Sequence, residues 1–176
     1  MKAIIIAAGS SSRLKKFTES LPKGLLEING KTIIQRQIEH LRNNGINDIV
    51  IVTGPNADCF NFKDITYVHD HNYEQHDVLG SLMAAKNHMN DGFIMLYSDI
   101  VFDESILKPI LNFKGKIGIA VDMDWKKKYK KRTKHPITNA DNVLIKSGKI
   151  THTKQFISKT KNKIFGYMVS IKLNMN

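Results

Sequence analysis

The sequence predicts an α/β fold: a mostly parallel, mixed sheet with helices on both faces, followed by a β-rich C-terminal part. Two observations carry this prediction. Short, β-branched apolar runs alternate with helical patterns from residue 2 to about residue 121. After residue 125, strand and turn signals replace that alternation. The 176 residues are expected to form a single domain, because no repeat or long linker divides them.

The first half of the chain alternates strands with one well-capped helix. Residues 2–8 form an apolar run that ends in a Gly/Ser cluster, as expected for a buried strand. A short strand at 25–28 precedes a helix that Thr32 can cap and that Gly45 can end. Its apolar stripe is Ile34, Ile38 and Leu41. Two further strands are expected over 48–53 and 65–68.

The second half begins with a helix expected over 78–89, whose core contacts should be Leu79, Leu82, Met83 and Met89. A strand at 93–97, a helix at 104–111 and a strand at 116–121 follow. Residues 126–134 are expected to be irregular or helical. The remaining expected elements are a hairpin of 142–145 and 149–153, with Gly148 in its turn, and a last strand over 164–173.

The net charge of +11 is concentrated in one stretch. Residues 124–163 hold 13 Lys and Arg but only two Asp, and the rest of the chain is neutral. Such a field attracts anions, so a phosphorylated small molecule, a nucleic acid or an acidic surface fits, with a plain solvated face as the alternative. The absence of a basic module interleaved with aromatic residues argues against nucleic acid.

The cysteine content and the apolar runs bear on the compartment. Cys59 is the only cysteine, so no intrachain disulfide can form and a reducing compartment is expected. No apolar run approaches the ~18 residues that a membrane-spanning helix needs. We therefore expect a cytoplasmic protein without a membrane partner.

A Gly/Ser-rich loop leaves the carboxyl end of the first expected strand, which is the edge where open parallel sheets bind ligands. Small residues such as Gly9 and Ser10 let backbone N–H groups approach a phosphate, and Arg13 offers a fork for its oxygens. Lys23 can act as a point charge on the same anion. A serine-rich turn without any ligand is the alternative.

A carboxylate is expected at the same edge. Asp99 follows the strand at 93–97, and Mg²⁺ takes one or two carboxylates together with substrate oxygens. A helix cap or a loop acid is the alternative interpretation of Asp99. His69, His71 and His76 form a local group, but no supporting Cys or Glu pattern accompanies them, so zinc is not predicted.

The stretch AAGSSSRLKKFTESLPKGLLEINGKTIIQRQIEHL resembles the opening of the sugar-nucleotidyltransferase-like family. The later segments VLGSLMAAK, LYSDIVFDESIL and DMDWKKKYKKRTKHPITNADNV agree with it. Within that family the similarity is closest to cytidylyltransferases that act on phosphocholine or 2-aminoethylphosphonate. The resemblance implies a Rossmann-like nucleotidyltransferase fold with a nucleotide-binding part, 1–122, and a basic acceptor-side part, 123–176.

The resemblance also implies a reaction. A cytidylyl group would pass from CTP, with Mg²⁺ as cofactor, to a small phosphate or phosphonate, with release of pyrophosphate. The alternatives are a sugar-1-phosphate nucleotidyltransferase and a non-catalytic nucleotide-binding module. A homodimer is also considered. The family usually supplies a second metal aspartate beyond the part that corresponds to this chain, so its C-terminal segment is expected to be missing here.

By this resemblance, Arg13 and Lys23 contact the triphosphate and Asp99 is the metal ligand, and these three form the expected catalytic set. The expected nucleotide-binding residues are Ala8, Gly9, Ser10, Thr53, Gly54 and Ser81.

The acceptor is expected to bind in the basic stretch. An acceptor with an ammonium at one end and a phosphate at the other needs carboxylates and an aromatic face for its cation and basic residues for its anion. The candidates are Asp122, Asp124, Trp125, Tyr129, Arg132 and His135. Asp77 joins them, since its carboxylate can hold an ammonium; the favoured alternative is that it caps the helix starting at residue 78.

Overall fold

The computed structural model describes residues 1–9, 21–89, 92–129, 141–155 and 164–173. The chain divides into two compact units, the first made of Met1–Gly118 with Ser170–Asn176 and the second of Ile119–Val169. The expected single domain with functional parts 1–122 and 123–176 stays a prediction. Among the described residues, no helix has both the length and the apolar character needed to cross a membrane.

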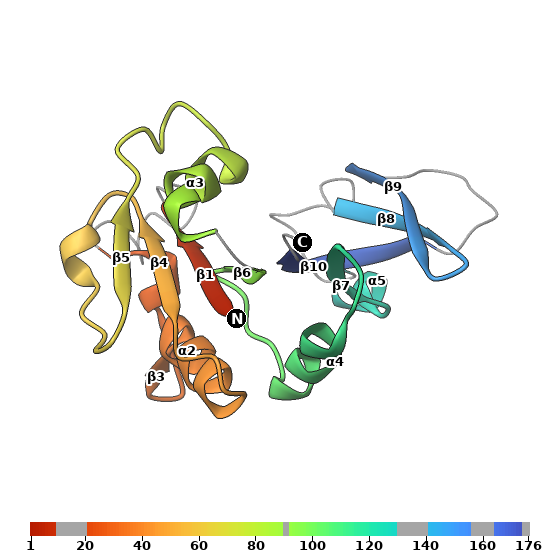
Figure 1. Ribbon diagram of the computed structural model, residues 1–176, viewed down its shortest axis with the longest axis horizontal. Helices are drawn as coiled ribbons and strands as arrows, with labels where there is room; N and C mark the ends of the chain where they lie inside the picture. Colours follow the sequence, from red (N-terminus) through yellow and green to blue (C-terminus); the bar gives the residue numbers. More distant parts are fainter. Residues whose placement is uncertain (10–20, 90–91, 130–140, 156–163, 174–176) are drawn as a thin grey trace. The chain divides into compact units, whose positions relative to one another are not determined.

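The first unit is built on a parallel sheet with the strand order β5-β4-β1-β6 (Figure 1). These strands are β1 (Lys2–Ala7), β4 (Ile49–Thr53), β5 (Thr66–His69) and β6 (Phe93–Tyr97). Every residue of β4 is buried, as are nearly all residues of β1 and β6. Because successive side chains point to opposite faces, both faces of these strands are covered. The predicted α/β fold with a parallel sheet is confirmed.

The helix α2 (Ile33–Asn43) begins where the sequence predicted. The Thr32 side chain accepts a hydrogen bond of 3.1 Å from the Gln35 backbone N–H, and Gly45 follows the helix with a φ of 78°. Before α2, a short 3₁₀ turn, η2 (Lys23–Leu25), leads into a two-residue hairpin of β2 (Glu27–Ile28) and β3 (Lys31–Thr32). The strand expected over 25–28 is therefore shorter than predicted.

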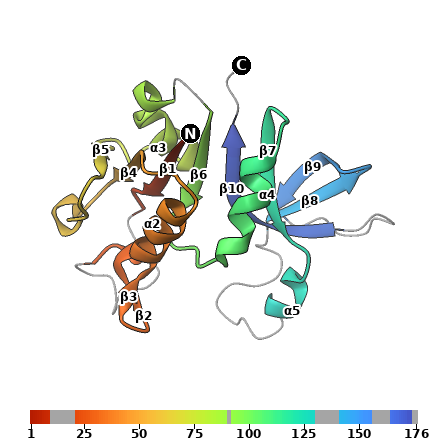
Figure 2. The same ribbon diagram turned by 60° about the horizontal axis from the view of Figure 1, so that its bottom comes forward.

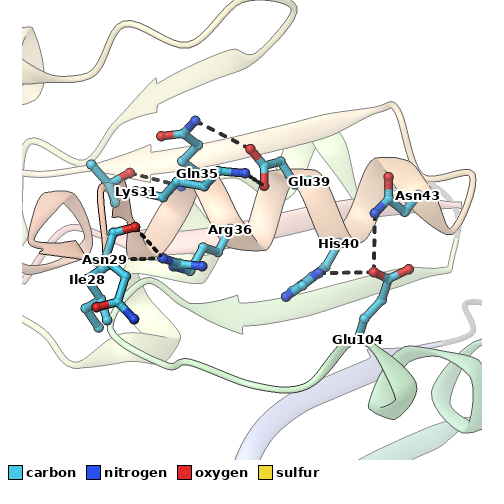
Figure 3. A network of polar contacts seen from close by, with 10 residues as sticks. Ile28, Asn29, Lys31, Gln35, Arg36, Glu39, His40, Asn43 and Glu104 are labelled. Carbon is cyan, nitrogen blue, oxygen red and sulfur yellow. Dashed lines mark hydrogen bonds and ion pairs between the residues drawn. The ribbon is translucent and has the colours of Figure 1, made fainter.

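Polar side chains on the outer surface of α2 tie it to its neighbours (Figure 3). Arg36 donates to the backbone carbonyls of Ile28 and Asn29 in the turn between β2 and β3. At the other end of the helix, Asn43 and His40 contact the carboxylate of Glu104 at 3.2 and 3.3 Å. The first contacts span seven and eight residues and the second more than sixty, so together they fix α2 relative to the segments before and after it.

The helix expected over 78–89 is shorter, and its buried face differs from the prediction. It comprises α3 (Val78–Ala84), followed by a 3₁₀ turn, η4 (Lys86–His88). Leu82 is buried as expected, but Leu79 is 64% exposed and Met83 49% exposed, so their assignment to the core was wrong. The buried stripe instead contains Ser81, Leu82 and Ala85. The apolar pattern offers two stripes on a short helix, and only one of them packs inward.

After β6, the chain forms η5 (Glu104–Ile106) and α4 (Leu107–Asn112), which together match the helix expected over 104–111. Ser170–Leu173, the end of β10 (Ile164–Leu173), pairs antiparallel with β6 and makes the first unit's sheet mixed, as predicted.

The second unit is mostly β-structure, as expected for the C-terminal part. It contains β8 (Asp141–Lys146) and β9 (Lys149–Gln155), an antiparallel hairpin visible in Figure 2. Its turn is Ser147-Gly148, where both residues have positive φ. The start of β10 pairs antiparallel with β8, and β7 (Ile117–Asp122) pairs with β10. A short helix, α5 (Trp125–Tyr129), occupies part of the stretch predicted to be irregular or helical.

Candidate active site

The parallel register brings three loops to one edge of the first unit's sheet. β1 lies between β4 and β6, so its carboxyl end is flanked by theirs. The chain continues from these ends as Ala8-Gly9, Gly54-Pro55 and Ser98-Asp99. Because β1 has β4 on one side and β6 on the other, the strand order reverses at β1. Open parallel sheets bind ligands at the carboxyl edge, beside such a reversal.

A cation and a carboxylate meet at this edge. The Nζ atom of Lys23 lies 3.9 Å from Oδ2 of Asp99, and their side chains are 28% and 51% exposed. These two predicted catalytic residues, separated by most of the first unit's sequence, are therefore brought together. An exposed ion pair of this length adds little to stability, so both groups are open to exchange their mutual contact for a ligand.

Backbone packing places both residues. Lys23 starts η2, and the next residue, Gly24, is buried so tightly that an added Cβ would lie 2.5 Å from Cδ1 of Ile34 and 2.9 Å from Cβ of Ser98. Ser98, which precedes Asp99, extends the β1–β6 ladder through its N–H, 3.1 Å from the carbonyl of Ile6. Only a glycine after Lys23 allows the two segments to approach this closely.

The predicted nucleotide-binding residues at the ends of β1 and β4 pack against each other. Ala8 is buried, and a Cβ on Gly54 would lie 2.3 Å from its carbonyl oxygen. Among the described residues, none would lie within 4 Å of a Cβ on Gly9. The side chain of Thr53 is buried, and its hydroxyl donates to the carbonyl of Val68 at 3.4 Å.

The residues before α3 form a locally bonded loop. Asp77 caps the helix, accepting hydrogen bonds from the backbone N–H groups of Leu79 and Gly80 at 3.0 and 3.5 Å. Ser81 is buried in the first turn of the helix. Asp70 is 3% exposed, and its Oδ1 accepts from the N–H of Asn72 and lies 3.2 Å from Nε2 of His76. Asp77 therefore has the favoured capping role, and its contact with an acceptor stays a prediction.

Apart from Asp77, the predicted acceptor residues that the structure describes lie in the second unit. Oδ1 of Asp122 accepts from the N–H of Asp124, and Oδ1 of Asp124 pairs with Nζ of Lys127 at 2.9 Å, which raises the pKa of that lysine. Trp125 is 5% exposed, and the ammonium of Lys126 lies 5.8 Å from its ring centroid. The ring of Trp125, which was expected to face the ammonium of the acceptor, therefore faces the ammonium of Lys126.

Several predicted residues are not placed. Ser10, Arg13, Arg132 and His135 lie outside the described residues, and Tyr129 is described only as the last residue of the α5 backbone. Their expected roles stay predictions.

The donor set at the sheet edge fits a magnesium ion. Asp99 offers one largely accessible carboxylate, and Mg²⁺ commonly binds one or two carboxylates while phosphate oxygens and water complete its shell. Across the described parts of the chain, no three His, Cys, Asp or Glu side chains are grouped closely enough to hold a metal by themselves. The ring centroids of His69 and His71 lie 4.4 Å apart, whereas Nε2 of His76 lies 3.2 Å from Oδ1 of Asp70.

Sequence reasoning missed Gly24, which decides how closely Lys23 approaches Asp99. The importance of Gly24 lies in the buried side chains around it, and no local sequence pattern reveals those neighbours.

Known proteins resemble this chain in sequence and in fold. A family model described as the MobA-like NTP transferase domain matches residues 3–136. A CTP:phosphoglutamine cytidylyltransferase of Campylobacter jejuni is 32% identical over 161 residues, covering 85% of this chain and 64% of the relative. A choline-phosphate cytidylyltransferase of Streptococcus pneumoniae is 35% identical over 106 residues, 58% of this chain and 46% of the relative. The chain thus spans less than two thirds of these relatives.

The fold has a solved counterpart in the inositol-1-phosphate CTP transferase of T. maritima. The TM-score is 0.76 at 19% identity, covering 98% of this chain and 70% of that one. Together, the sequence and structure matches confirm the resemblance inferred from the opening motif and the predicted fold class.

Proposed function

Because the chain belongs to the family of MobA-like NTP transferase domains, we propose that it transfers a cytidylyl group from CTP to a small phosphate or phosphonate. The observation that carries this proposal is the meeting of Lys23 and Asp99 at the ligand-binding edge of the parallel sheet. CTP is favoured as donor because two relatives matched over more than half of this chain are named as cytidylyltransferases.

The proposed reaction needs little from the protein beyond positioning and charge. An acceptor phosphate oxygen attacks the α-phosphorus of CTP, the bond from that phosphorus to the bridging oxygen breaks, and pyrophosphate leaves with the electron pair. The attacking oxygen is already anionic at neutral pH, so no general base is required. Lys23 neutralises charge on the phosphate under attack, and the main catalytic contribution is electrostatic.

Asp99 is proposed to hold Mg²⁺, which when bound would neutralise negative charge on the phosphates. Arg13, Ser10 and the backbone of Gly9 are proposed to contact the triphosphate, and Ala8, Thr53, Gly54 and Ser81 to contact the nucleoside. The remaining proposed residues bind the acceptor: Asp77, Asp122, Asp124, Trp125, Tyr129, Arg132 and His135. We also propose a cytoplasmic location, which the single cysteine supports because no intrachain disulfide can form.

Pyrophosphate release tests the proposal. The chain is incubated with CTP and Mg²⁺ and, separately, with phosphocholine, 2-aminoethylphosphonate, phosphoglutamine or glucose 1-phosphate. Release with one of the first three acceptors, lost in Asp99→Asn but kept in Asp58→Asn, is the expected result. Asp58 is a matched control because it is an exposed aspartate in a different loop, η3 (Ala57–Cys59).

Two other outcomes would replace the proposal. Release only with glucose 1-phosphate indicates a sugar-1-phosphate nucleotidyltransferase. A rise in melting temperature with CTP, but no release with any acceptor, indicates a nucleotide-binding module without transfer activity.

A further inference from the structure

Gln37 is a buried polar residue on the apolar stripe of α2. It is 1% exposed and lies among the buried residues Ile33, Ile34, Ile38 and Leu41 of the same helix. Glutamine is seldom this deeply buried, and its Oε1 is buried with no hydrogen-bond partner among the described residues. A buried amide oxygen without a hydrogen bond lowers the free energy of unfolding. A glutamine at this position therefore calls for an explanation, and the contacts of its Nε2 atom provide one.

The Nε2 atom of Gln37 donates two hydrogen bonds to the turn that carries Asp99. It lies 2.9 Å from the carbonyl oxygen of Tyr97 and 2.6 Å from that of Ile100. These carbonyls stand on either side of Ser98-Asp99. The turn's own hydrogen bond, from the N–H of Ile100 to Tyr97, is long at 3.4 Å. The side-chain amide therefore closes the turn better than its backbone does.

The helix that carries Gln37 also supports Lys23. Ile34, one turn before Gln37, is the buried side chain against which Gly24 packs. The N–H of Ile33 donates to the carbonyl of Leu26, just after η2. Figure 3 shows the same helix holding Glu104, beyond the Asp99 turn. α2 therefore contacts both segments that carry the residues of the candidate site, Lys23 and Asp99.

We propose that Gln37 is a positioning residue for the reaction, which fixes the Asp99 turn so that the carboxylate is oriented toward the metal and faces Lys23. This inference rests on the proposed function for its metal. The glutamine amide offers two N–H groups, one for each carbonyl, without bringing a charge into the buried site. Methionine matches the shape without donors, and glutamate replaces the donors with acceptors that would repel both carbonyls.

The test compares Gln37→Met with Gln35→Met, a matched control. Gln35 lies on the same helix, is half-buried, and its side chain contacts Glu39 at 3.4 Å instead of the Asp99 turn. In the metal-free proteins, hydrogen exchange of the segment 97–101 should become faster in Gln37→Met only, while exchange in β4 stays unchanged. This measurement requires no activity.

Metal binding and kinetics complete the test. In the presence of CTP, the Mn²⁺ affinity of Gln37→Met, measured by electron paramagnetic resonance of free Mn²⁺, should fall about 10–100-fold, the usual effect of losing an outer-shell partner. The kcat should fall with it, while KM for CTP changes little. Should Gln37→Met not fold, Gln37→Asn retains both N–H groups on a side chain one methylene shorter and should show a smaller loss of the same kind.

Lower stability of the Gln37 variant with Mn²⁺ affinity, kcat and exchange at 97–101 equal to those of Gln35→Met would overturn the inference, because Gln37 would then be only a core residue. If the wild type releases no pyrophosphate, the proposed function fails, but exchange at 97–101 and Mn²⁺ affinity still decide the role of Gln37. If the wild type binds no Mn²⁺ either, the metal role of Asp99 is lost, and the inference with it.

Discussion

The two sides of the candidate site are held in place by different kinds of contact. On one side, Lys23 and Asp99 depend on contacts between different elements: Gly24 packs against Ile34 and Ser98, and Gln37 of α2 donates to the turn of Asp99. On the other side, the loop before α3 is bonded within itself: Asp77 caps its own helix, and Asp70 contacts residues up to His76. The first side is organised by the fold, and the second by its local sequence.

This difference predicts how far the structural effect of a substitution extends from its site. A disturbance of α2 should reach both Lys23 and Asp99, because the helix packs against the segments that carry them. A disturbance of the 70–80 loop should remain there, since the side-chain hydrogen bonds that the structure describes for it join residues within the loop. The predictions below test that contrast.

The largest expected effect is on catalysis, from Lys23→Ala. Removal of one preorganised cation from the phosphate should lower kcat by about 10²–10³-fold. The melting temperature should hardly change, because the 3.9 Å pair with Asp99 is partly exposed and such pairs contribute at most about 1 kcal/mol. Steady-state kinetics and thermal unfolding measure the two effects. Lys108→Ala, an exposed lysine on α4, is the control, and an equal loss of activity and stability in Lys23→Ala would contradict a catalytic role.

A pair of glycine substitutions tests the contrast directly. Gly24→Ala places a methyl group against buried Ile34 and Ser98 and should lower the free energy of unfolding by about 1–3 kcal/mol. Gly80→Ala places its methyl 2.3 Å from Cγ and 2.6 Å from Cβ of His76, so the loop before α3 must shift to admit it. Its cost should be smaller than that of Gly24→Ala, because residues 74–79 are exposed and can shift, and because alanine favours the helix by about 1 kcal/mol.

Chemical denaturation of both variants gives the two free energies. The contrast between the sides of the site would be wrong if Gly80→Ala were the more destabilising change. Gly24→Ala should also lower activity, since both catalytic side chains rest on this packing.

The cap at α3 offers a smaller effect. Asp77→Ala removes the acceptor for the N–H groups of Leu79 and Gly80 and should cost about 1 kcal/mol of stability. Asp77→Asn keeps the cap without the charge and should unfold like the wild type. A raised KM for the acceptor in Asp77→Asn, measured with stability unchanged, would show that the carboxylate also contacts an ammonium.

The smallest expected effect is acid sensitivity at the end of α2. Hydrogen bonds from Asn43, Asn44 and His40 hold the pKa of Glu104 below its ordinary value of 4.5. A carboxyl whose pKa is lower in the folded state adds stability above its unfolded pKa and loses it as pH falls through the folded pKa. Thermal unfolding below pH 4.5 should therefore be less acid-sensitive in Glu104→Gln than in the wild type. An identical pH profile in both proteins would rule out this contribution.

Local patterns predicted most of the secondary structure. The strands β1, β4 and β6 are short, continuous apolar runs, because both faces of each strand are covered, and Thr32 and Gly45 marked the ends of α2. Asp99 was predicted at the ligand edge because it directly follows a buried strand. The sequence patterns did not predict the end of α3 at Ala84, since neither glycine nor proline stops it there.

What the sequence by itself determined is therefore the set of strands, the helix caps, the resemblance to a nucleotidyltransferase and the candidate residues at the strand ends. These depend on neighbours within a few positions, where hydrophobic period and capping chemistry act. The tertiary structure alone decided that Leu79 and Met83 face outward, that Gly24 lies against Ile34, and that the amide of Gln37 meets carbonyls 60 and 63 residues away. Contacts at such separations leave no periodic trace in the chain, because they exist only once the sheet and α2 have packed together.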